Sequence, residues 1–404
     1  MNKSTATLTE TNFFTLHCMV TGKGGPPCLH CCHLNFGGVV LVDLSAAFDL
    51  VSPTLLIQKM KIYGFDDDTT TWVLSYLTDR YQSVWIDHVF SDFIENSIGV
   101  PQGSNLGPLF FLIFFNDLPT YITENIDCYA DDSTVGATAK HVDEIGAKLS
   151  RDCGQLSSWM HANSFKLNAD KTHFLVMGTA ERLNNMVEDL VVVMDGVRLE
   201  ESKDKSAELL GVTVQCNLKW SLQVESLAKK LKTRLTGLEK LKYVMSSSNK
   251  KNIVQGVFNS VLCYCLPLFG GCSKTDVKLL QVLQNRAAQV VLRLPPRTGR
   301  ALMFDKLDWL TVQQLIAYHT LIAVFRIRQT REPEDLATIL SRENNTKHII
   351  MKNTNLVLYR QSFMFREAVL WNRLTLDLRK ETTIMQFKRN LRGWIKENVS
   401  RFND

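Results

Sequence analysis

Three aspartates occupy positions where a β-sheet could bring their carboxylates together. Asp43 directly follows Val39–Val42, a continuous apolar run typical of a strand covered on both faces. Asp131 and Asp132 form a pair in a predicted tight turn between two short strands. If these strands are neighbours, the three carboxylates converge. Like charges that close stay ionised only when a cation lies between them.

The donor atoms limit which metal such a site would take. Carboxylate oxygens without Cys or His favour Mg²⁺ or Mn²⁺. Two such ions, about 3.5–4 Å apart, are the usual apparatus of in-line phosphoryl transfer. One ion lowers the pKa of an attacking 3′-hydroxyl, and the other holds the triphosphate and its leaving group. Taken alone, however, an Asp-Asp pair is more often ordinary turn chemistry, because aspartate is common in turns.

The elements around these residues predict an α+β fold, with a mixed sheet and helices packed on one of its faces. Hydrophobic periodicity and capping residues predict helices at Ser52–Gly64, Asp67–Thr78, Pro108–Leu118 and His141–Ala162. They predict strands at Val39–Val42, Tyr81–His88, Phe93–Ile98, Asp127–Ala130, Thr134–Ala137, Lys166–Leu167, Phe174–Met177, Leu190–Met194, Val197–Leu199 and Leu209–Val214. Asp195-Gly196 is a hairpin turn signal. The pattern is mostly helical from Trp220 to the C-terminus.

The chain therefore divides into a leader and three regions. Residues 1–35 form a leader without periodicity, 36–216 the sheet domain, 217–300 a basic helical region and 301–404 a helical C-terminal region. The leader gathers Cys28, His30, Cys31, Cys32 and His33. Because no second pair follows at the spacing of a zinc finger, we expect an unstructured segment rather than a metal site.

Composition and charge narrow the class of protein. The chain has 404 residues, 45% hydrophobic and 22% charged, which excludes disorder. Its ten cysteines without a secretory signal indicate a reduced, nuclear or cytoplasmic protein, and its apolar runs are too short to span a membrane. Between Lys219 and Arg300, 15 Lys and Arg accompany three Asp and Glu. This excess of basic residues is typical of a protein that binds a polyanion. Solvated helix faces would give the same excess.

Five sequence strings in a fixed order carry a family resemblance. They are DLSAAFD (Asp43–Asp49), GVPQGSNLGPLFF (Gly99–Phe111), YADD (Tyr129–Asp132), LNADKTHFLVMG (Leu167–Gly178) and LLGVTVQCNLKW (Leu209–Trp220). Together they resemble the successive palm motifs of reverse transcriptases from non-LTR, LINE-type retrotransposons. Leu292–Arg300, Leu307–Gln314 and the stretch at Leu370–Asn372 resemble thumb and later segments of the same elements.

The resemblance implies roles in the palm for individual residues. Asp43, Asp131 and Asp132 would be the metal-binding catalytic aspartates, with Asp132 the less strictly required of the pair. Phe48 would lie beneath the sugar of the incoming nucleotide and exclude a 2′-hydroxyl, although ordinary core packing explains a phenylalanine equally simply. Gln102 and Gly103 lie at the family's contact with nucleotide and template. Lys171 occupies the position of a lysine proposed to protonate the leaving pyrophosphate.

The resemblance also assigns residues that hold nucleic acid. Leu210, Gly211 and Val212 match the primer-grip hairpin. The basic helices after Trp220 would form the thumb, which recognises the A-like shape of an RNA–DNA hybrid rather than its sequence. Its residues nearest the duplex backbone would be Lys229, Lys230, Lys232 and Arg234.

The expected activity is RNA-directed DNA polymerisation with two Mg²⁺ or Mn²⁺ ions. The expected partners are an RNA template, a DNA primer and dNTP, with no membrane; the sequence does not indicate an oligomeric state. A complete element of this kind carries an endonuclease and polymerase fingers upstream, and the residues before Asp43 match neither. The alternative is therefore a catalytically inactive remnant that binds nucleic acid through its basic thumb.

Overall fold

The chain folds into two compact units, as seen in a computed structural model. The structure describes residues 36–42, 44, 46–168, 171–186, 189–240, 243–295, 297–350 and 363–398. The first unit comprises Asn35–Lys205, and the second contains Ser206–Asp404. The leader 1–35, with its Cys and His residues, lies outside the described residues, and so does Asp43.

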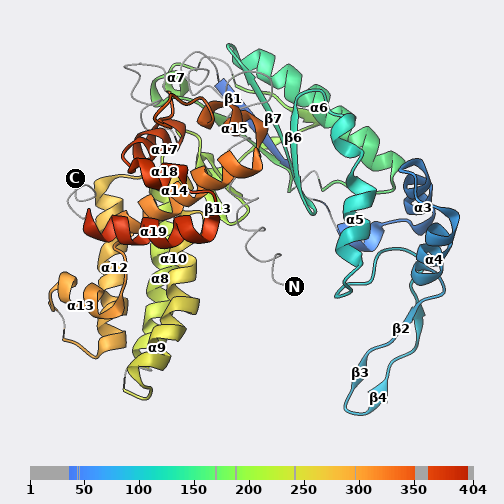
Figure 1. Cartoon of the computed structure of the whole chain (residues 1–404). Coiled ribbons are helices and arrows are strands. Elements are labelled where there is room, and N and C mark those ends of the chain that lie inside the picture. The colour runs from blue at the N-terminus through green and yellow to red at the C-terminus, as the bar shows by residue number, and fades with distance from the viewer. Residues whose placement is uncertain are drawn as a thin grey trace. The chain divides into compact units, whose positions relative to one another are not determined.

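A five-stranded sheet is the centre of the first unit (Figure 1), with the strand order β11-β8-β1-β7-β6. Its strands are β1 (Phe36–Val42), β6 (Asn125–Tyr129), β7 (Asp132–Ala139), β8 (His173–Met177) and β11 (Glu200–Glu201). β1 pairs antiparallel with β7 and β8, β6 pairs antiparallel with β7, and β11 runs parallel to β8. β1 thus has a paired strand at each edge, and the consecutive residues Val39 and Val40, which point to opposite faces of the sheet, are both buried, as its continuous apolar sequence predicts. The predicted α+β class is confirmed.

Helix α6 (Val142–Ala162) packs closely on β1 through the apolar stripe expected from its sequence. Gly38 makes the close approach possible. A Cβ atom at Gly38 would lie 2.5 Å from Cγ2 of Ile145 and 2.9 Å from Cδ1 of Leu149. Both side chains are fully buried. The second glycine of the FGGVVLV strand is therefore required by packing.

Replacing Gly38 with alanine should destabilise the first unit by about 1–3 kcal/mol, because the added methyl overlaps Ile145 in a closed core. Gly37→Ala is the matched control, since a Cβ there would meet no atom closer than 3.7 Å. Urea unfolding followed by circular dichroism measures both. Equal stability of the two variants would contradict this account of the strand.

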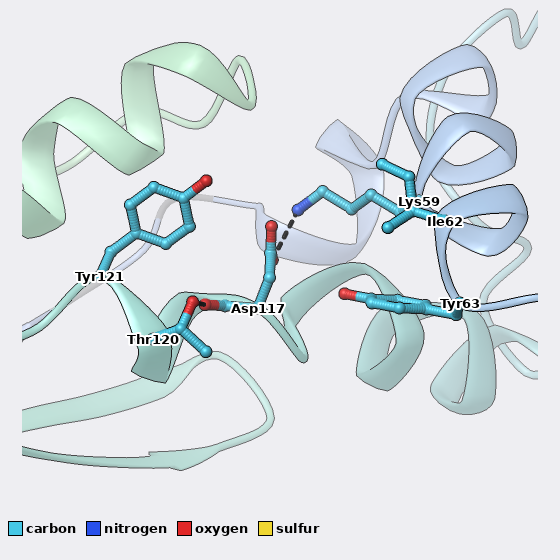
Figure 2. Close-up of a pocket in the computed structure, with 6 residues that line it drawn as sticks. All are labelled: Lys59, Ile62, Tyr63, Asp117, Thr120 and Tyr121. Carbon is cyan, nitrogen blue, oxygen red and sulfur yellow. Dashed lines mark hydrogen bonds and ion pairs between the residues drawn. The ribbon is translucent and has the colours of Figure 1, made fainter.

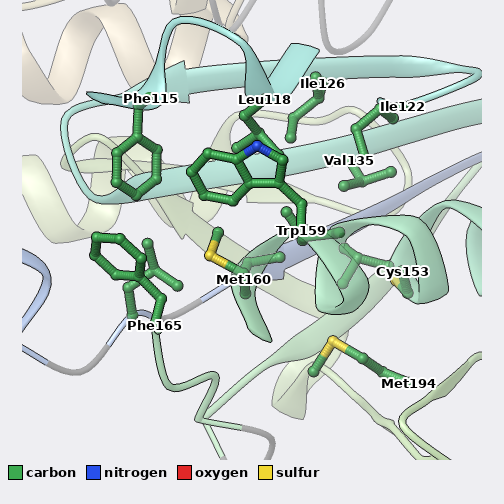
Figure 3. Packing of buried hydrophobic residues seen from close by; sticks show 14 of the residues in the cluster. Phe115, Leu118, Ile122, Ile126, Val135, Cys153, Trp159, Met160, Phe165 and Met194 are labelled. Carbon is green, nitrogen blue, oxygen red and sulfur yellow. The ribbon is translucent and has the colours of Figure 1, made fainter. Parts of the chain in front are cut away.

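An aromatic cluster fills the core beside α6 (Figure 3). Phe115 lies 5.1 Å from Trp159 and 5.0 Å from Phe165, measured between ring centroids. Phe114 packs against the same two rings at 6.4 and 5.5 Å. All four side chains are buried. The cluster joins α5 (Gly107–Phe115) to α6 and so anchors the helix that follows the Pro101-Gln102-Gly103 segment.

The N-terminal helices follow the predicted boundaries. A 3₁₀ helix, η1 (Ala47–Leu50), precedes α3 (Pro53–Ile62) and α4 (Asp67–Leu77), and a second one, η2 (Leu118–Thr120), follows α5. Ser52 caps α3, as predicted, by accepting a hydrogen bond from the backbone N–H of Leu55 at 3.4 Å. Asp66 caps α4 in the same way, accepting from Thr69 at 2.7 Å.

A long two-stranded ribbon follows α4 and extends away from it (Figure 1). The continuous strand predicted at Tyr81–His88 is wrong, because pairing is interrupted where Val84 bonds Ser91 outside the regular ladder. The resulting short strands are β2 (Tyr81–Gln82), β3 (Trp85–Ile86), β4 (Val89–Phe90) and β5 (Ile94–Glu95). β2 pairs with β5, as predicted for Phe93–Ile98, and β3 with β4.

The end of the first unit contains only short elements. These are α7 (Ala180–Asn184), β9 (Val193–Met194), β10 (Val197–Arg198) and the 3₁₀ turn η3 (Lys203–Lys205). The predicted hairpin turn at Asp195-Gly196 is confirmed, with φ of 51° and 76°. The strand predicted at Lys166–Leu167 is reduced to an isolated bridge between Leu167 and Leu44.

The second unit opens with a hairpin and continues as helices. The single strand predicted at Leu209–Val214 is wrong: β12 (Ser206–Leu209) and β13 (Val212–Gln215) are antiparallel and reverse at Leu210-Gly211. The helices are α8 (Ser221–Lys240), α9 (Ser247–Val254), the π-helix η4 (Gln255–Asn259), α10 (Ser260–Cys263), α11 (Leu266–Phe269), α12 (Lys274–Leu292), α13 (Arg300–Leu307), α14 (Val312–Thr330), α15 (Glu334–Leu340), α17 (Phe363–Asn372), α18 (Leu376–Lys380) and α19 (Ile384–Glu397).

The boundary between the units differs from the predicted one at 216–217. The hairpin belongs with the helices because Gln223, buried on α8, accepts a hydrogen bond from the backbone N–H of Thr213 at 2.8 Å. The predicted basic and C-terminal regions lie in this same unit. Within the described residues, no single helix is long and apolar enough to cross a bilayer. The pair α13 and α14 reaches that length and composition only across a 43° bend.

Candidate active site

The Asp131-Asp132 pair lies at the tip of the β6–β7 hairpin. Tyr129 pairs with Asp132, so the two-residue loop is Ala130-Asp131, one position earlier than predicted. Ala130 accommodates the reversal with a positive φ of 52°. Asp132 is the first residue of β7, and both aspartates are exposed to solvent. Their carboxylates are therefore accessible to a ligand.

The strand register brings three chain segments to one end of the sheet. Val42, the last residue of β1, pairs with Ser133, which directly follows Asp132. Leu41 pairs with His173, the first residue of β8. β1 and the aspartate hairpin are thus neighbours, which is the condition for the carboxylates to converge. Asp43 itself follows Val42 outside the described residues, so its convergence with the pair stays a prediction.

Lys171 lies two residues before β8, at the same end of the sheet. Its backbone N–H donates to the carbonyl of Asn168 at 3.1 Å in a turn, and its side chain is exposed. From this position the Lys171 side chain could approach a leaving group bound near the aspartates. Its role in proton transfer stays a prediction.

Phe48, on η1, is supported from one side by the aromatic core. Its ring stacks on that of Phe111 with centroids 4.3 Å apart and an interplanar angle of 18°. Phe111 is only 1% exposed and stacks in turn on Phe115 at 4.3 Å. Phe48 itself remains partly exposed. Core packing therefore accounts for one face of the ring and leaves part of it available to a ligand.

The segment with Gln102 and Gly103 is fixed against the Phe48 segment by backbone hydrogen bonds. Val100 N–H donates to the carbonyl of Phe48 at 2.9 Å, and Gly99 N–H to that of Val51 at 2.8 Å. Gly99 has a φ of 81°, and a Cβ there would lie 2.8 Å from Cα of Asp49. Only glycine fits this crossing.

The same segment ends in an open turn. The guanidinium of Arg80 holds the start of this segment by donating a hydrogen bond to the carbonyl of Gly99 at 2.6 Å. Gly103 has a φ of 80°, and no atom lies within 4 Å of a Cβ built on it. Gln102 is exposed beside it. The backbone of Gly103 and the side-chain amide of Gln102 are thus accessible, at a turn whose neighbouring residues are fixed by hydrogen bonds.

The donor chemistry at the sheet end fits a hard divalent cation. Two exposed carboxylates, those of Asp131 and Asp132, lie there, and neither Cys nor His is needed for Mg²⁺ or Mn²⁺. Within the described part of the chain, no three His, Cys, Asp or Glu side chains gather as ligands. The predicted third ligand, Asp43, is outside that part.

Comparison with known proteins identifies a domain in the first half of the chain. Residues 33–214 match the model of reverse transcriptases (RNA-dependent DNA polymerases). The chain is 26% identical over 305 residues to a probable RNA-directed DNA polymerase from transposon BS of Drosophila melanogaster, covering 71% of this chain and 32% of that protein. The chain contains a reverse transcriptase domain that resembles those of non-LTR, LINE-type retrotransposons. The recognition of the five motifs is thereby confirmed.

A second relative gives the same picture of coverage. The RNA-directed DNA polymerase from mobile element jockey of Drosophila melanogaster is 25% identical over 266 residues, which are 63% of this chain and 28% of that protein. The chain thus spans about a third of the length of these relatives. A solved Candida albicans telomerase matches 87% of this chain and 55% of its own at 11% identity, with a TM-score of 0.33, too low to assign a fold.

Asp49, the last residue of the DLSAAFD motif, has no role predicted from the sequence. The carboxylate Oδ1 of Asp49 accepts a hydrogen bond from Nε2 of Gln102 at 2.9 Å. With its amide nitrogen engaged, Gln102 has its Oε1 left as an acceptor. Only the proximity of the two motifs in space reveals the pair, because 53 residues separate them in the chain.

Asp49→Ala is expected to raise the KM for dNTP by about two- to tenfold, the effect of one hydrogen bond that orients Gln102. The double variant Asp49→Ala/Gln102→Ala should match Gln102→Ala alone, because the two side chains act as one unit. Steady-state primer extension measures all three. Asp92→Ala, an exposed carboxylate on the ribbon, controls for lost charge. Additive effects in the double variant would refute the coupling.

The second unit contains the remaining predicted residues. Leu210 and Gly211 form the two-residue loop of the β12–β13 hairpin with φ of 47° and 78°, and Val212 is buried at the start of β13. The hairpin implied for the primer grip is therefore present. Its assignment to a primer stays a prediction.

The four predicted backbone-binding residues all lie on α8. Lys229, Lys230 and Lys232 are exposed. Arg234 is also exposed, but its guanidinium donates to the carbonyl of Val257 at 2.5 Å. Contact of these residues with a nucleic-acid backbone stays a prediction, and Arg234 also has a structural partner within its own unit.

A pocket of about 260 Å³ lies apart from the predicted residues, between α3 and η2 (Figure 2). Lys59 projects into it and donates to Asp117 Oδ1 and to the carbonyl of Phe114, both at 2.8 Å. Burial lowers the pKa of Lys59, and Asp117 opposes that shift. Burial also raises the pKa of Tyr63, the residue that ends α3. Because Lys59 bonds both Asp117 and the carbonyl of Phe114, we assign it the structural role of joining α3 to the segment before η2.

Proposed function

We propose that this chain is an RNA-directed DNA polymerase module that adds dNTP to a primer 3′ end on an RNA template. The observation that supports this most directly is the end of the sheet. There, β1 and the β6–β7 hairpin of a reverse transcriptase domain bring exposed Asp131 and Asp132 beside the strand that leads to Asp43. Whole-length relatives carry the name RNA-directed DNA polymerase.

In the proposed reaction, the primer 3′-oxygen attacks the α-phosphorus of dNTP. A new P–O bond forms while the bond to the bridging oxygen breaks, and pyrophosphate leaves. Asp43, Asp131 and Asp132 would hold two Mg²⁺ or Mn²⁺ ions, which supply activation of the 3′-hydroxyl and neutralise charge on the phosphates.

The other palm residues position the substrate in this proposal. Gln102, oriented by Asp49, would offer its amide oxygen to the nucleotide. Phe48 would contact the sugar and leave no room for a 2′-hydroxyl. Lys171 would give a proton to the leaving pyrophosphate. Each of these residues lies on an element already fixed by packing or backbone hydrogen bonds, which reduces reorganisation during the reaction.

The second unit would hold the primer–template. Its hairpin would contact the primer end, and the exposed Lys229, Lys230 and Lys232 would neutralise phosphates of the hybrid. Such contacts fix position without reading sequence, so binding should weaken steeply with salt and depend little on base composition.

Primer extension on poly(rA) with an oligo(dT) primer, in the presence of Mg²⁺ or Mn²⁺, tests the proposal. The purified chain should add dTMP, and a chelator should stop the addition. Folded protein that binds the hybrid but never extends it would overturn the polymerase proposal. That outcome would establish the alternative, a catalytically inactive nucleic-acid-binding remnant.

A further inference from the structure

The helix that leads to Tyr264 contains an unusual π-helical turn. α9 continues through η4 into α10 as one run from Ser247 to Cys263, with the π-helix at Gln255–Asn259. π-turns inside α-helices are rare and are found frequently at functional sites. The guanidinium of Arg234 on α8 satisfies the carbonyl of Val257 inside this turn at 2.5 Å. The turn is therefore held in place by a neighbouring helix.

Tyr264, directly after this run, contacts the tip of the β12–β13 hairpin. Its hydroxyl donates a hydrogen bond to the backbone carbonyl of Leu210 at 2.7 Å. A Cβ built on Gly211 would lie 3.7 Å from the ring carbon Cε1 of Tyr264, which is ordinary contact distance. The tyrosine thus lies against both loop residues.

The tip needs such support because of its backbone conformation. Leu210 has a φ of 47°, a conformation that non-glycine residues adopt rarely and at a cost in free energy. The base of the hairpin is anchored independently. Gln223 accepts from the N–H of Thr213 at 2.8 Å, and Gln215 accepts from that of Leu222 at 3.0 Å. Loss of the Tyr264 hydroxyl would therefore release the tip and leave the base attached.

We propose that Tyr264 is a positioning residue that holds the Leu210-Gly211 tip ready to receive the primer 3′ end. This inference rests on the proposed function, since it assumes that the hairpin grips a primer. A tip that is already ordered loses less conformational freedom when it binds, so affinity for the primer rises. The residue acts on primer binding and does not touch the nucleotide.

Tyr264→Phe removes the hydroxyl and keeps the ring against Gly211. We expect it to weaken binding of a DNA primer–RNA template hybrid by about three- to tenfold, as for one lost hydrogen bond. Fluorescence anisotropy measures this affinity without catalysis. At saturating hybrid, kcat and the KM for dTTP should stay at wild-type values. Tyr318→Phe on α14, another partly buried tyrosine of the same unit, is the matched control and should bind normally.

The outcomes separate this inference from the function beneath it. If wild type extends primers and Tyr264→Phe binds the hybrid as tightly as Tyr318→Phe, the positioning role is wrong. A lower melting temperature with unchanged affinity would likewise overturn it and assign Tyr264 to packing alone. If wild type fails to extend, the proposed function fails first, and the inference falls with it. A selective loss of hybrid affinity in an active enzyme supports the proposal.

Discussion

Replacing Asp131 with asparagine is expected to abolish primer extension and leave the fold intact. Asparagine has nearly the same size and is common in turns, so the Ala130-Asp131 loop should form unchanged. The substitution removes one anionic oxygen from the proposed metal site, where a bound ion contributes several kcal/mol to the transition state. At 1.36 kcal/mol per factor of ten, the rate should fall by about a thousandfold or more. Single-nucleotide extension measures it.

Asp87→Asn is a matched control for this variant. Asp87 is an exposed aspartate in the two-residue turn between β3 and β4, so the substitution makes the same chemical change in another hairpin. It should leave the rate at the wild-type level. Asp132→Asn should cause a smaller loss than Asp131→Asn, because Asp132 matches the less strictly required member of the pair. An Asp131→Asn enzyme that extends at the wild-type rate would exclude a metal role for this carboxylate.

Elements with a long, one-sided pattern were predictable from the sequence. α6 repeats apolar residues at helical spacing for 21 residues, and its boundaries differ by one residue from the prediction. β1 is apolar without alternation because its successive residues Val39 and Val40, which point to opposite faces of the sheet, are both buried. In both cases burial within one compact unit determines the order of apolar and polar residues. The element can therefore be predicted from that order.

Short elements were predicted less well because tertiary contacts determine them. Leu209–Val214 has the composition of one strand, yet it reverses at Leu210, a residue whose positive φ no propensity favours. The reversal is held by Tyr264, a residue 54 positions later. The continuous strand predicted at Tyr81–His88 was likewise wrong, because the backbone N–H of Val84 donates to the side-chain hydroxyl of Ser91 and interrupts the ladder.

The candidate site was predictable where a motif names the residue and less so where two motifs meet. The sequence motifs YADD and GVPQGSNLGPLFF and their turn-forming residues predict the aspartate hairpin and the exposed turn at Gln102. The Asp49–Gln102 hydrogen bond does not, because it depends on the crossing of two backbone segments permitted by Gly99. The hydrogen bond from Arg234 to the carbonyl of Val257 was not predictable for the same reason, since Val257 lies in a π-turn that the sequence does not signal.

Phe48→Val is expected to reduce discrimination against ribonucleotides. The valine side chain leaves the space into which the ring projects, so a 2′-hydroxyl would fit. The ratio of kcat/KM for dTTP to that for UTP should fall by at least about tenfold, within the range that pocket shape provides. The lost stack on Phe111 should also cost about 1–2 kcal/mol of stability, less than for a fully buried ring. Parallel extension assays with each nucleotide give the ratio.

Phe165→Val makes the same chemical change in the same aromatic core. Phe165 is 2% exposed and packs on Phe115, which also packs on Phe111 beneath Phe48. This control should lower stability at least as much as Phe48→Val and leave the nucleotide ratio unchanged. If both variants are destabilised and both keep the wild-type ratio, Phe48 is a core residue only. If the ratio falls for Phe48→Val alone, the exposed part of the ring selects the sugar, because loss of packing by itself would affect the two variants alike.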